Sequence, residues 1–576
     1  MIDLITRVNQ TINGFVWGPI MLMVFLLVGL MFTLRTGFFQ VTRFKLWFSK
    51  TFLACIKNKS VRKTDDKTSI SQFQSLCTSL AATLGTGNIA GVATAIVAGG
   101  PGAVFWMWIS AFLGMMTNFA ENVLGIKYRY KNEKNEWCGG AMIYMERGLG
   151  WKWMAIIYSA FCLLASFGIG NMTQANSIAN GLSDSFGIPA LTTGIVIAVL
   201  VALVIMGGIK RIASVTEKFV PIMSIAYLIG SMIIIICHAE NISDSFYLIF
   251  TEAFRLKSAF GGIAGYTIMK AMGTGVSRGV FSNEAGLGSS VIVNSASDVK
   301  EPVQQGMWGI FQVFADTIVV CTITAVVILC SGVYNKDTFQ LYYNKEIDGK
   351  TIADTVIDIK ENTIQKLENV KPNANTEIEI TAIIYNAINE VILKTDLYED
   401  DARIIIGNAK DTFISLGDSG KKRAEQLDVK DLDYVHNSID NLVTSSLEQV
   451  DDIPIKDGVS LTILAFESVF GSFGSKFVSI AVVFFAFSTL IGWSYYGQRA
   501  IEYLIGPKFV PLYKIIFSLI IIIGATLSLN LVWDVSDTFN GLMAIPNLIA
   551  ITLLSGTVIK ITKNYFAGKE FDPNED

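Results

Sequence analysis

Apolar residues recur in long runs along the chain, and this pattern predicts helices that cross a membrane. A helix needs about 20 mainly apolar residues to span the hydrocarbon core of a bilayer. The eleven predicted spans are 15–34, 70–98, 102–127, 153–180, 189–207, 216–237, 260–290, 303–332, 475–503, 511–532 and 538–561. We therefore expect an all-α protein that crosses the lipid bilayer many times.

The composition supports this class of protein. The chain has 576 residues, of which 52% are hydrophobic and 16% are charged, and its mean hydropathy is +0.48. A soluble domain carries about 25% charged residues. The first run, 15–34, is too long for the apolar segment of a signal peptide and lacks a cleavage site with small residues. It is therefore expected to remain as a span.

The sequence shows no catalytic or metal-binding pattern. The seven cysteines include no C-x-x-C pair, and His238 and His436 are isolated. Most of the cysteines lie within apolar runs, where a small buried hydrophobic residue is their usual role. We expect no enzyme activity, no bound cofactor and no nucleic-acid partner.

A long polar segment separates the eighth and ninth spans. Residues 335–457 include 14 basic and 25 acidic side chains, whereas the rest of the chain has 31 basic and 24 acidic ones. Its apolar residues recur at helical spacing, which predicts a small, mainly helical domain. The predicted domains are a membrane domain in two parts, 1–332 and 458–576, and an insert at 333–457. The insert is either a tolerated loop insertion or a domain with a ligand of its own.

Positive charges in short loops predict the orientation of the chain. Lys and Arg are concentrated in 35–69, 127–152 and 210–218, which lie on one side of the membrane if there are eleven spans. Short loops rich in Lys and Arg face the cytoplasm. The N-terminus and the insert are then outside the cell, the C-terminus is cytoplasmic, and the expected location is the plasma membrane.

Glycines interrupt the second span at Gly85-Thr-Gly-Asn-Ile-Ala-Gly91. Loosening a helix inside a membrane is costly, because no water bonds the released backbone groups. The interruption therefore indicates a binding site. The carbonyl end before Gly85 suits a cation such as Na⁺, and the amide end after it suits a carboxylate. Close packing between helices is the alternative role for such glycines, but Thr86 and Asn88 among them favour a site.

A second interruption is predicted in the seventh span, between Gly273 and Gly286. This segment contains Arg278 and Glu284, and charges inside a membrane are expensive and usually functional. The two side chains either pair with each other and keep the helix interrupted, or Glu284 contacts a ligand directly. Gly279 would let the backbone approach a ligand closely.

Two further polar groups lie inside apolar spans. Ser488 and Thr489 are adjacent hydroxyls in the ninth span, and they can complete a Na⁺ site with carbonyls from a broken helix. Bonding to the carbonyl four residues earlier is their alternative role. Gln174, in the fourth span, has an amide donor and acceptor, which suits a zwitterion.

Several longer motifs contain these residues. They are Gly85-Thr-Gly-Asn-Ile-Ala-Gly91, Gly139-Gly-Ala-Met-Ile-Tyr, Ser282-Asn-Glu-Ala-Gly-Leu-Gly288 and Phe487-Ser-Thr-Leu-Ile-Gly-Trp-Ser-Tyr-Tyr-Gly497, with Gln174 and Ala213-Ser-Val-Thr-Glu-Lys218. With them the chain, except 333–457, resembles the alanine or glycine:cation symporter (sodium:alanine symporter) family of the amino acid–polyamine–cation superfamily. The resemblance implies a LeuT-type fold, with two inverted repeats of five helices after one extra N-terminal helix. It also implies that the second and seventh spans are the broken ones.

The resemblance also implies the roles of the site residues. The substrate carboxylate would meet Thr86, Gly87 and Asn88. The amino group would meet Gln174 and the backbone of Gly279, Val280, Phe281 and Ser282. The substrate side chain would be crowded by Phe487, Ile491 and Trp493. The Na⁺ ligands would be the carbonyls of Ala81, Leu84 and Phe485 with the hydroxyls of Ser488 and Thr489.

The predicted function is secondary active symport by alternating access. Inward movement of Na⁺ would drive uptake of a small neutral amino acid, alanine or glycine. Coupling to H⁺, with Glu284 as the carrier, is the alternative within transport. A nutrient receptor whose external insert binds the ligand is the alternative from another class. It would need a cytoplasmic output domain, for which the tail after Lys560 is too short.

Overall fold

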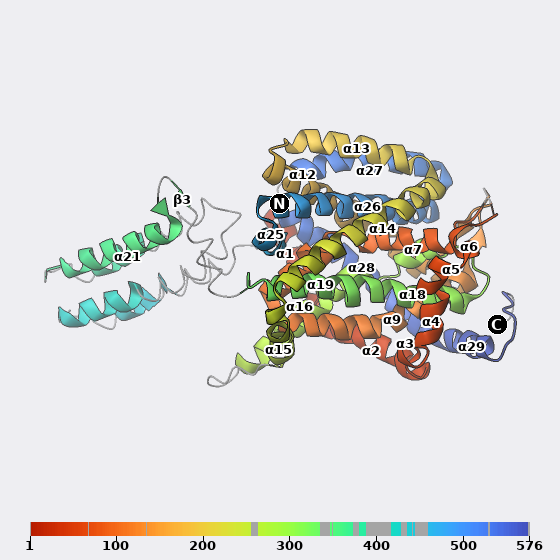
Figure 1. Ribbon diagram of the computed structural model, residues 1–576, viewed down its shortest axis with the longest axis horizontal. Helices are drawn as coiled ribbons and strands as arrows, with labels where there is room; N and C mark the ends of the chain where they lie inside the picture. Colours follow the sequence, from red (N-terminus) through yellow and green to blue (C-terminus); the bar gives the residue numbers. More distant parts are fainter. Residues whose placement is uncertain are drawn as a thin grey trace. The chain divides into compact units, whose positions relative to one another are not determined.

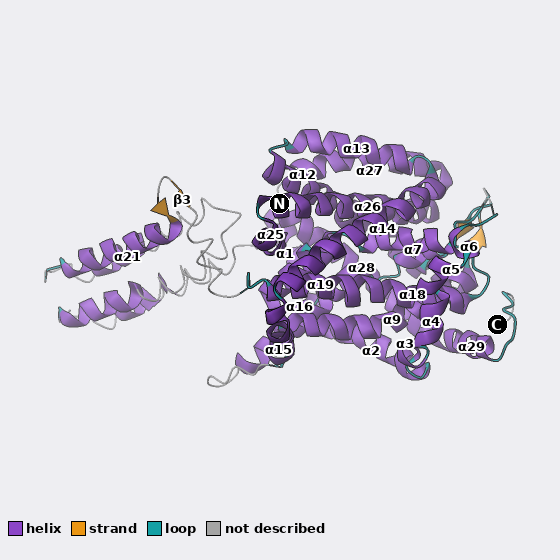
Figure 2. Cartoon of the chain, in the orientation of Figure 1, coloured by secondary structure: helices purple, strands orange, loops and turns teal. Residues whose placement is uncertain are grey.

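The computed structural model describes residues 2–66, 68–133, 135–254, 263–334, 346–347, 350–371, 379–387, 416–427, 435–440, 442–443, 459–527 and 530–573. These residues are almost entirely helical (Figure 2), and the strands among them form two short antiparallel hairpins. The contacts divide the chain into two compact units, one of residues 1–331 with 458–576 and the other of 332–457.

The larger unit contains most of the helices (Figure 1). Its first part has α1 (Ile2–Val16), α2 (Pro19–Arg35), α3 (Phe39–Thr42), α4 (Phe44–Lys50), α5 (Phe52–Lys57), α6 (Lys59–Arg62), α7 (Gln72–Thr83), η1 (Thr86–Asn88), α8 (Ala90–Gly99), α9 (Gly102–Tyr128), β1 (Tyr130–Lys131), β2 (Trp137–Cys138), α10 (Ala141–Leu149), α11 (Lys152–Phe167), η2 (Gly168–Met172), α12 (Thr173–Phe186), α13 (Ala190–Ile205), α14 (Gly208–Cys237), η3 (Ala239–Asn241) and α15 (Ile242–Glu252). The rest has α16 (Ile263–Asn283), α17 (Ser290–Asn294), α18 (Pro302–Val313), η4 (Phe314–Cys321), α19 (Thr322–Cys330), α25 (Val459–Phe470), α26 (Ser472–Ile505), η5 (Pro507–Phe509), α27 (Val510–Thr526), α28 (Asn530–Leu553) and α29 (Ser555–Phe566).

The apolar helices have the lengths that a membrane requires. Among the described residues, seven helices are long and apolar enough to cross a bilayer, and the bent pair α28 and α29 adds an eighth if the pair is one span. The predicted span 70–98 is divided between α7 and α8, and in the predicted span 260–290 the helix α16 ends at Asn283, before the end of the span. The protein is therefore an all-α, multi-pass membrane protein.

The distribution of polarity is that of a protein in lipid. Large apolar side chains such as Ile222, Leu203 and Leu519 are more than half exposed, at 69%, 58% and 56%. By contrast, polar side chains including Asn88 and Glu121 are completely buried between helices. Apolar side chains can face lipid, whereas a charged group is tolerated there only at high cost. Polar groups that could bind a ligand therefore lie in the interior.

Packing in the larger unit centres on α9 and α26. α9 packs against α16, α18 and α2, and α26 packs against α11 and α12, while α13 and α27 lie side by side (Figure 1). α7 begins with a capping box, in which Ser71 and Gln74 exchange side chain-to-amide hydrogen bonds of 3.1 and 3.0 Å. This cap fixes the start of the helix that leads to the first interruption.

The smaller unit is helical and has its own core. It contains the hairpin of β3 (Glu346–Ile347) and β4 (Lys350–Thr351), then α21 (Ile352–Glu368) and helical residues at 379–387, 416–426 and 435–440. Buried apolar residues from these helices form one cluster, which includes Ile359, Ile384 and Ile439.

Candidate functional site

The second predicted span is interrupted after α7. This helix ends at Thr83, the turn η1 covers 86–88, and α8 begins at Ala90. The amide of Gly85 donates to Asn88 Oδ1 at 3.1 Å, so a side chain replaces part of the helical bonding. A Cβ on Gly85 would lie 2.6 Å from Thr489 Oγ1, which leaves room only for glycine between α7 and α26.

Ser488 and Thr489 on α26 contact the carbonyl end of α7. The Thr489 hydroxyl lies 3.0 Å from the carbonyl oxygens of both Ala81 and Phe485. The Ser488 hydroxyl lies 2.8 Å from the Phe485 oxygen and 3.4 Å from the Ala81 oxygen. Thr489 thus makes the bond to the carbonyl four residues earlier, which is the alternative role, Ser488 bonds the carbonyl three residues earlier, and both hydroxyls also reach α7. Four oxygen atoms meet here, with Leu84 at the end of α7, and oxygen ligands of this kind suit a hard cation.

A π-helical turn positions Gln174. η2 lies between α11 and α12 in one continuous span, and such turns are frequent at functional sites. Gln174 Oε1 accepts a long hydrogen bond from the Thr86 hydroxyl at 3.4 Å, and its Nε2 donates to the Ile169 carbonyl at 3.1 Å. A Cβ on Gly170 would lie 2.4 Å from the side chain of Trp493. The turn therefore places an amide beside the first interruption and makes room for the indole.

Three residues predicted to crowd the substrate side chain lie on α26. Phe487, Ile491 and Trp493 are all buried. Phe487 lies against Phe219 of α14, with ring centroids 6.2 Å apart. The ring of Phe281 contacts the first interruption, because a Cβ on Gly87 would lie 3.4 Å from it. Aromatic walls thus come from both α16 and α26.

Asn88 links the two interrupted spans. Its Nδ2 donates to Ser282 Oγ at 3.0 Å and to Asp316 Oδ1 at 2.9 Å. The hydroxyls of Ser282 and Thr317 in turn donate to Asp316 Oδ2 at 2.7 and 2.8 Å. All four side chains are buried. This set of bonds joins η1, the end of α16 and the π-helical turn η4.

Asp316 is a site residue that the sequence reasoning missed. It is the only charged residue in the predicted span 303–332, and an intramembrane charge indicates a functional position. No ion pair among the described residues involves it, so only hydrogen-bond donors balance its carboxyl group. The structure thus adds a buried carboxyl group beside Asn88 and Ser282.

The interruption of the seventh span begins after α16. This helix continues through Gly279 and ends at Asn283, Glu284 follows with a φ of 59°, and α17 begins at Ser290. The interruption therefore lies at 284–289, towards the end of the predicted segment. A Cβ on Gly279 would lie 3.3 Å from Ser110 of α9, so this glycine serves close packing between helices.

The end of α16 releases its last carbonyl groups. In a continuing helix the amide of Gly286 would bond the carbonyl of Ser282, four residues earlier. It donates instead to Glu121 Oε1 at 3.0 Å. The amide of Ala285 likewise turns away from the Phe281 carbonyl and donates to a side chain at 3.0 Å. The Ser282 carbonyl thus lies at the negative end of the helix dipole, which suits an ammonium group.

The predicted pair of Arg278 and Glu284 is not formed. Arg278 pairs with Asp537 of α28 at 3.7 Å, and its guanidinium lies 5.5 Å from the ring centroid of Phe281. Glu284 accepts a hydrogen bond from the Ser289 hydroxyl at 2.6 Å. The two charges have different partners because Glu284 takes a left-handed backbone conformation just past the end of the helix.

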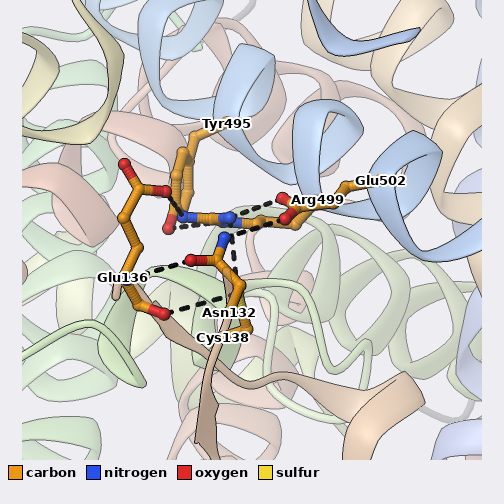
Figure 3. A network of polar contacts seen from close by, with 6 residues as sticks. All are labelled: Asn132, Glu136, Cys138, Tyr495, Arg499 and Glu502. Carbon is orange, nitrogen blue, oxygen red and sulfur yellow. Dashed lines mark hydrogen bonds and ion pairs between the residues drawn. The ribbon is translucent and has the colours of Figure 1, made fainter. Parts of the chain in front are cut away.

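A second polar cluster lies further along α26, with Arg499 at its centre (Figure 3). Arg499 is ten residues after Thr489, roughly 15 Å along the helix. Its guanidinium donates to Glu136 at 2.9 Å, to Glu502 at 2.5 Å and to the Tyr495 hydroxyl at 2.8 Å. Although it is charged, the Arg499 side chain is only 8% exposed.

The hairpin of β1 and β2 supplies the other half of this cluster. Asn132 donates to Glu502 Oε1 at 2.9 Å and accepts from the Glu136 amide at 2.9 Å (Figure 3). Cys138 Sγ lies 3.4 Å from an Arg499 nitrogen. Burial raises the pKa of the Cys138 thiol to about 11, so it is neutral at physiological pH. These bonds fasten the loop between α9 and α10 to the end of α26.

Comparison with known proteins identifies the class. The sodium:alanine symporter family matches residues 2–356 and 438–575. A relative from Methanococcus maripaludis, named Sodium/alanine symporter AgcS, is 37% identical over 98% of this chain and 97% of its own length. An uncharacterized transporter from Haemophilus influenzae is 35% identical over 98% of this chain and 96% of its own. A Bacillus subtilis protein named Probable sodium/glutamine symporter GlnT is 30% identical over 97% and 90%.

Interrupted helices with buried polar groups inside an apolar helix bundle are typical of multi-pass membrane transporters, and the family that matches is one of transporters rather than enzymes. The chain belongs to the sodium:alanine symporter family. It is accordingly a cation-coupled amino acid symporter, and residues 357–437, within the smaller unit, lie outside the family match.

Replacing Asp316 with Ala is expected to destabilise the protein by about 1–3 kcal/mol, because the buried hydroxyls of Ser282 and Thr317 lose their carboxylate acceptor and Asn88 loses one of its acceptors. Thermal unfolding of the purified protein in detergent measures the change. The matched control is Asp244→Ala at an exposed position of α15, expected to stay within about 0.5 kcal/mol. Equal unfolding temperatures for the two variants would contradict the structural role of the Asp316 carboxyl group.

Replacing Arg499 with Gln is expected to cost about 3 kcal/mol, since Glu136 and Glu502 then lose their shared cation. The control is Lys152→Gln, which removes an exposed ion pair to Glu146 at 3.9 Å and is expected to cost less than about 1 kcal/mol. Both are measured by thermal unfolding. A smaller loss for Arg499→Gln than for Lys152→Gln would show that the cluster does not stabilise the fold.

Proposed function

We propose that the protein is a Na⁺-coupled symporter that takes up a small neutral amino acid, alanine or glycine, across the plasma membrane. The observation that carries the proposal is the 3.0 Å hydrogen bond between Asn88 and Ser282. This bond joins the turn η1, which leads into the amide end of α8, to the carbonyl end of α16. A free amino acid has one negative and one positive group, and these two helix ends offer complementary partial charges.

The proposed architecture is a LeuT-type fold with eleven spans. One extra N-terminal helix would precede two inverted repeats of five, in which the spans at 70–98 and 260–290 are the broken pair. The membrane domain would comprise 1–332 and 458–576, with the insert 333–457 outside the cell, the N-terminus outside and the C-terminus in the cytoplasm. The two interruptions observed at 84–89 and 284–289 support this assignment.

The proposed substrate site is built around η1 and the end of α16. Thr86, Gly87 and Asn88 would bind the carboxylate, where amides at the start of α8 favour a negative charge. The amino group would meet Gln174 and the backbone at the carbonyl end of α16, where the Gly286 amide does not bond the Ser282 carbonyl. Of the residues first predicted for that role, Phe281 and Ser282 are at the carbonyl end, whereas Gly279 and Val280 are inside the helix. Phe281, Phe487, Ile491 and Trp493 would restrict the size of the substrate side chain.

Na⁺ is proposed to bind between α7 and α26. Its ligands would be the carbonyls of Ala81, Leu84 and Phe485 and the hydroxyls of Ser488 and Thr489, four of which already lie within hydrogen-bonding distance of a partner in the set. A cation there would tie the end of α7 to α26 and stabilise the form that binds substrate. Binding energy that differs between two conformations is what shifts their populations.

Replacing Ser488 and Thr489 together with Ala is expected to raise the Na⁺ concentration for half-maximal alanine uptake at least tenfold, since two of the proposed ligands are lost. Tenfold corresponds to about 1.4 kcal/mol. Uptake into proteoliposomes at graded Na⁺ measures this. The control is Ser494→Ala on the same helix, whose buried hydroxyl bonds the Ile491 carbonyl at 2.7 Å. An unchanged Na⁺ response in the double variant would overturn the cation assignment, and uptake driven by a pH gradient without Na⁺ would favour coupling to H⁺.

A panel of competing amino acids tests the substrate class. Excess alanine and glycine are expected to inhibit labelled alanine uptake, whereas tryptophan and lysine should not, because buried aromatic side chains surround the site. Glutamine belongs in the panel since one relative is named for it. Equal inhibition by small and large amino acids would refute the proposed size limit. Labelled uptake that no amino acid inhibits would refute amino acid transport itself.

A further inference from the structure

The interruption at 284–289 has an unusual backbone. Three of its residues have positive φ angles: Glu284 at 59°, Gly286 at 95° and Gly288 at 72°. The left-handed region is unfavourable for a residue with a side chain such as Glu284. Such a conformation persists inside a membrane only where other groups bond the released amides and carbonyls.

Glu121 of α9 supplies two of these bonds. A single oxygen atom, its Oε1, accepts from the amide of Gly286 at 3.0 Å and from the amide of Gly288 at 3.1 Å. The same oxygen accepts from Asn547 Nδ2 at 2.6 Å. Glu121 is completely buried and lies 165 residues before Gly286 in the sequence.

Asn547 of α28 completes the arrangement from the other side. Its Nδ2 also donates to the carbonyl of Gly286 at 2.9 Å, and its Oδ1 accepts from the Tyr144 hydroxyl. A Cβ on Gly288 would lie 2.8 Å from Asn547, so the segment is enclosed closely. Three elements, α9, α10 and α28, thus determine the path of the chain after α16.

The bonds to Glu121 have a direct consequence for the candidate substrate site. The Gly286 amide would otherwise continue α16 by bonding the carbonyl of Ser282. Glu121 Oε1 accepts this amide instead, so the bond from Gly286 to the Ser282 carbonyl is not made and α16 ends at Asn283, where the Ala285 amide also donates to a side chain. Ser282 is also the residue whose hydroxyl meets Asn88.

We propose that Glu121 is a positioning residue for transport: it ends α16 at Asn283 and so presents the Ser282 carbonyl to the amino group of the substrate. The inference rests on the proposed function and extends it to a side chain outside the binding site. The acceptor atom Oε1 performs this role, since Oε2 has no hydrogen-bond partner among the described residues.

Two conservative variants separate the acceptor from the charge. Glu121→Gln retains an oxygen acceptor at the same reach and removes the carboxyl group. Glu121→Asp retains the carboxyl group, but its side chain is one methylene shorter and no longer reaches the amides of Gly286 and Gly288. The matched control is Asn122→Ala, the next residue on α9, whose Nδ2 bonds the Asn118 carbonyl at 2.9 Å within the same helix.

The first measurement is alanine uptake into proteoliposomes, with the maximal rate and the substrate concentration for half-maximal uptake determined separately. Glu121→Gln and Asn122→Ala are expected to stay within about threefold of the parent protein in half-maximal concentration. Glu121→Asp is expected to raise that concentration at least tenfold, equivalent to about 1.4 kcal/mol. A purely structural role would lower the amount of active protein and the maximal rate without this change. The proposal is wrong if the order of the Gln and Asp variants is reversed, or if both match the control.

The second measurement does not depend on transport. Amide hydrogen exchange of the peptide that covers 284–289 is expected to accelerate at least tenfold in Glu121→Asp and to remain slow in Glu121→Gln and Asn122→Ala. Unchanged exchange in Glu121→Asp would overturn the proposal. If the parent protein transports no amino acid, the proposed function fails, and the exchange experiment still decides whether Glu121 determines where α16 ends.

Discussion

The structure depends on one constraint: inside a membrane, every backbone amide and carbonyl released by a broken helix needs a partner. At the first interruption the side chain of Asn88 accepts the Gly85 amide. At the second, Glu121 accepts two amides and Asn547 donates to a carbonyl. These side chains come from the loop itself and from distant helices. They keep two helix ends open in the interior without exposing them to lipid.

The same constraint explains why the interior is polar and the surface apolar. Side chains that replace helical bonds must themselves be buried, and each then needs its own partners. Asn88 therefore donates hydrogen bonds to Ser282 and Asp316, and Asp316 also accepts a hydrogen bond from the Thr317 hydroxyl. The π-helical turns η2 and η4 lie beside these groups and position Gln174 and Asp316 respectively. The buried polar residues beside the interruptions therefore form a connected hydrogen-bond network.

The sequence predicted the parts of this arrangement that have a local signal. Glycines with Thr86 and Asn88 inside an apolar run identified the first interruption, and adjacent hydroxyls identified Ser488 and Thr489, which do reach α7. Glycine was a weaker guide in the seventh span, because Gly279 serves helix packing and the break begins at Glu284. Asp316 could have been found as a lone intramembrane charge. Glu121 and Asn547 could not be linked to the loop from sequence, since they lie 165 and 261 residues away from Gly286 and only the fold brings them together.

The geometry of α26 gives the proposed coupling a physical basis. This helix is continuous from Ser472 to Ile505, so the hydroxyls that meet α7 and the Arg499 cluster belong to one rigid element. α7, by contrast, is connected to α8 only through the interruption at 84–89. A cation between Ala81 and Thr489 would therefore tie the C-terminal end of α7 to the continuous helix α26. It would act at the same interruption whose other side is proposed to bind the substrate carboxylate. Ion and substrate would thus stabilise the same arrangement of the first interruption without touching the same atoms, which is the condition for coupling through a shared conformation.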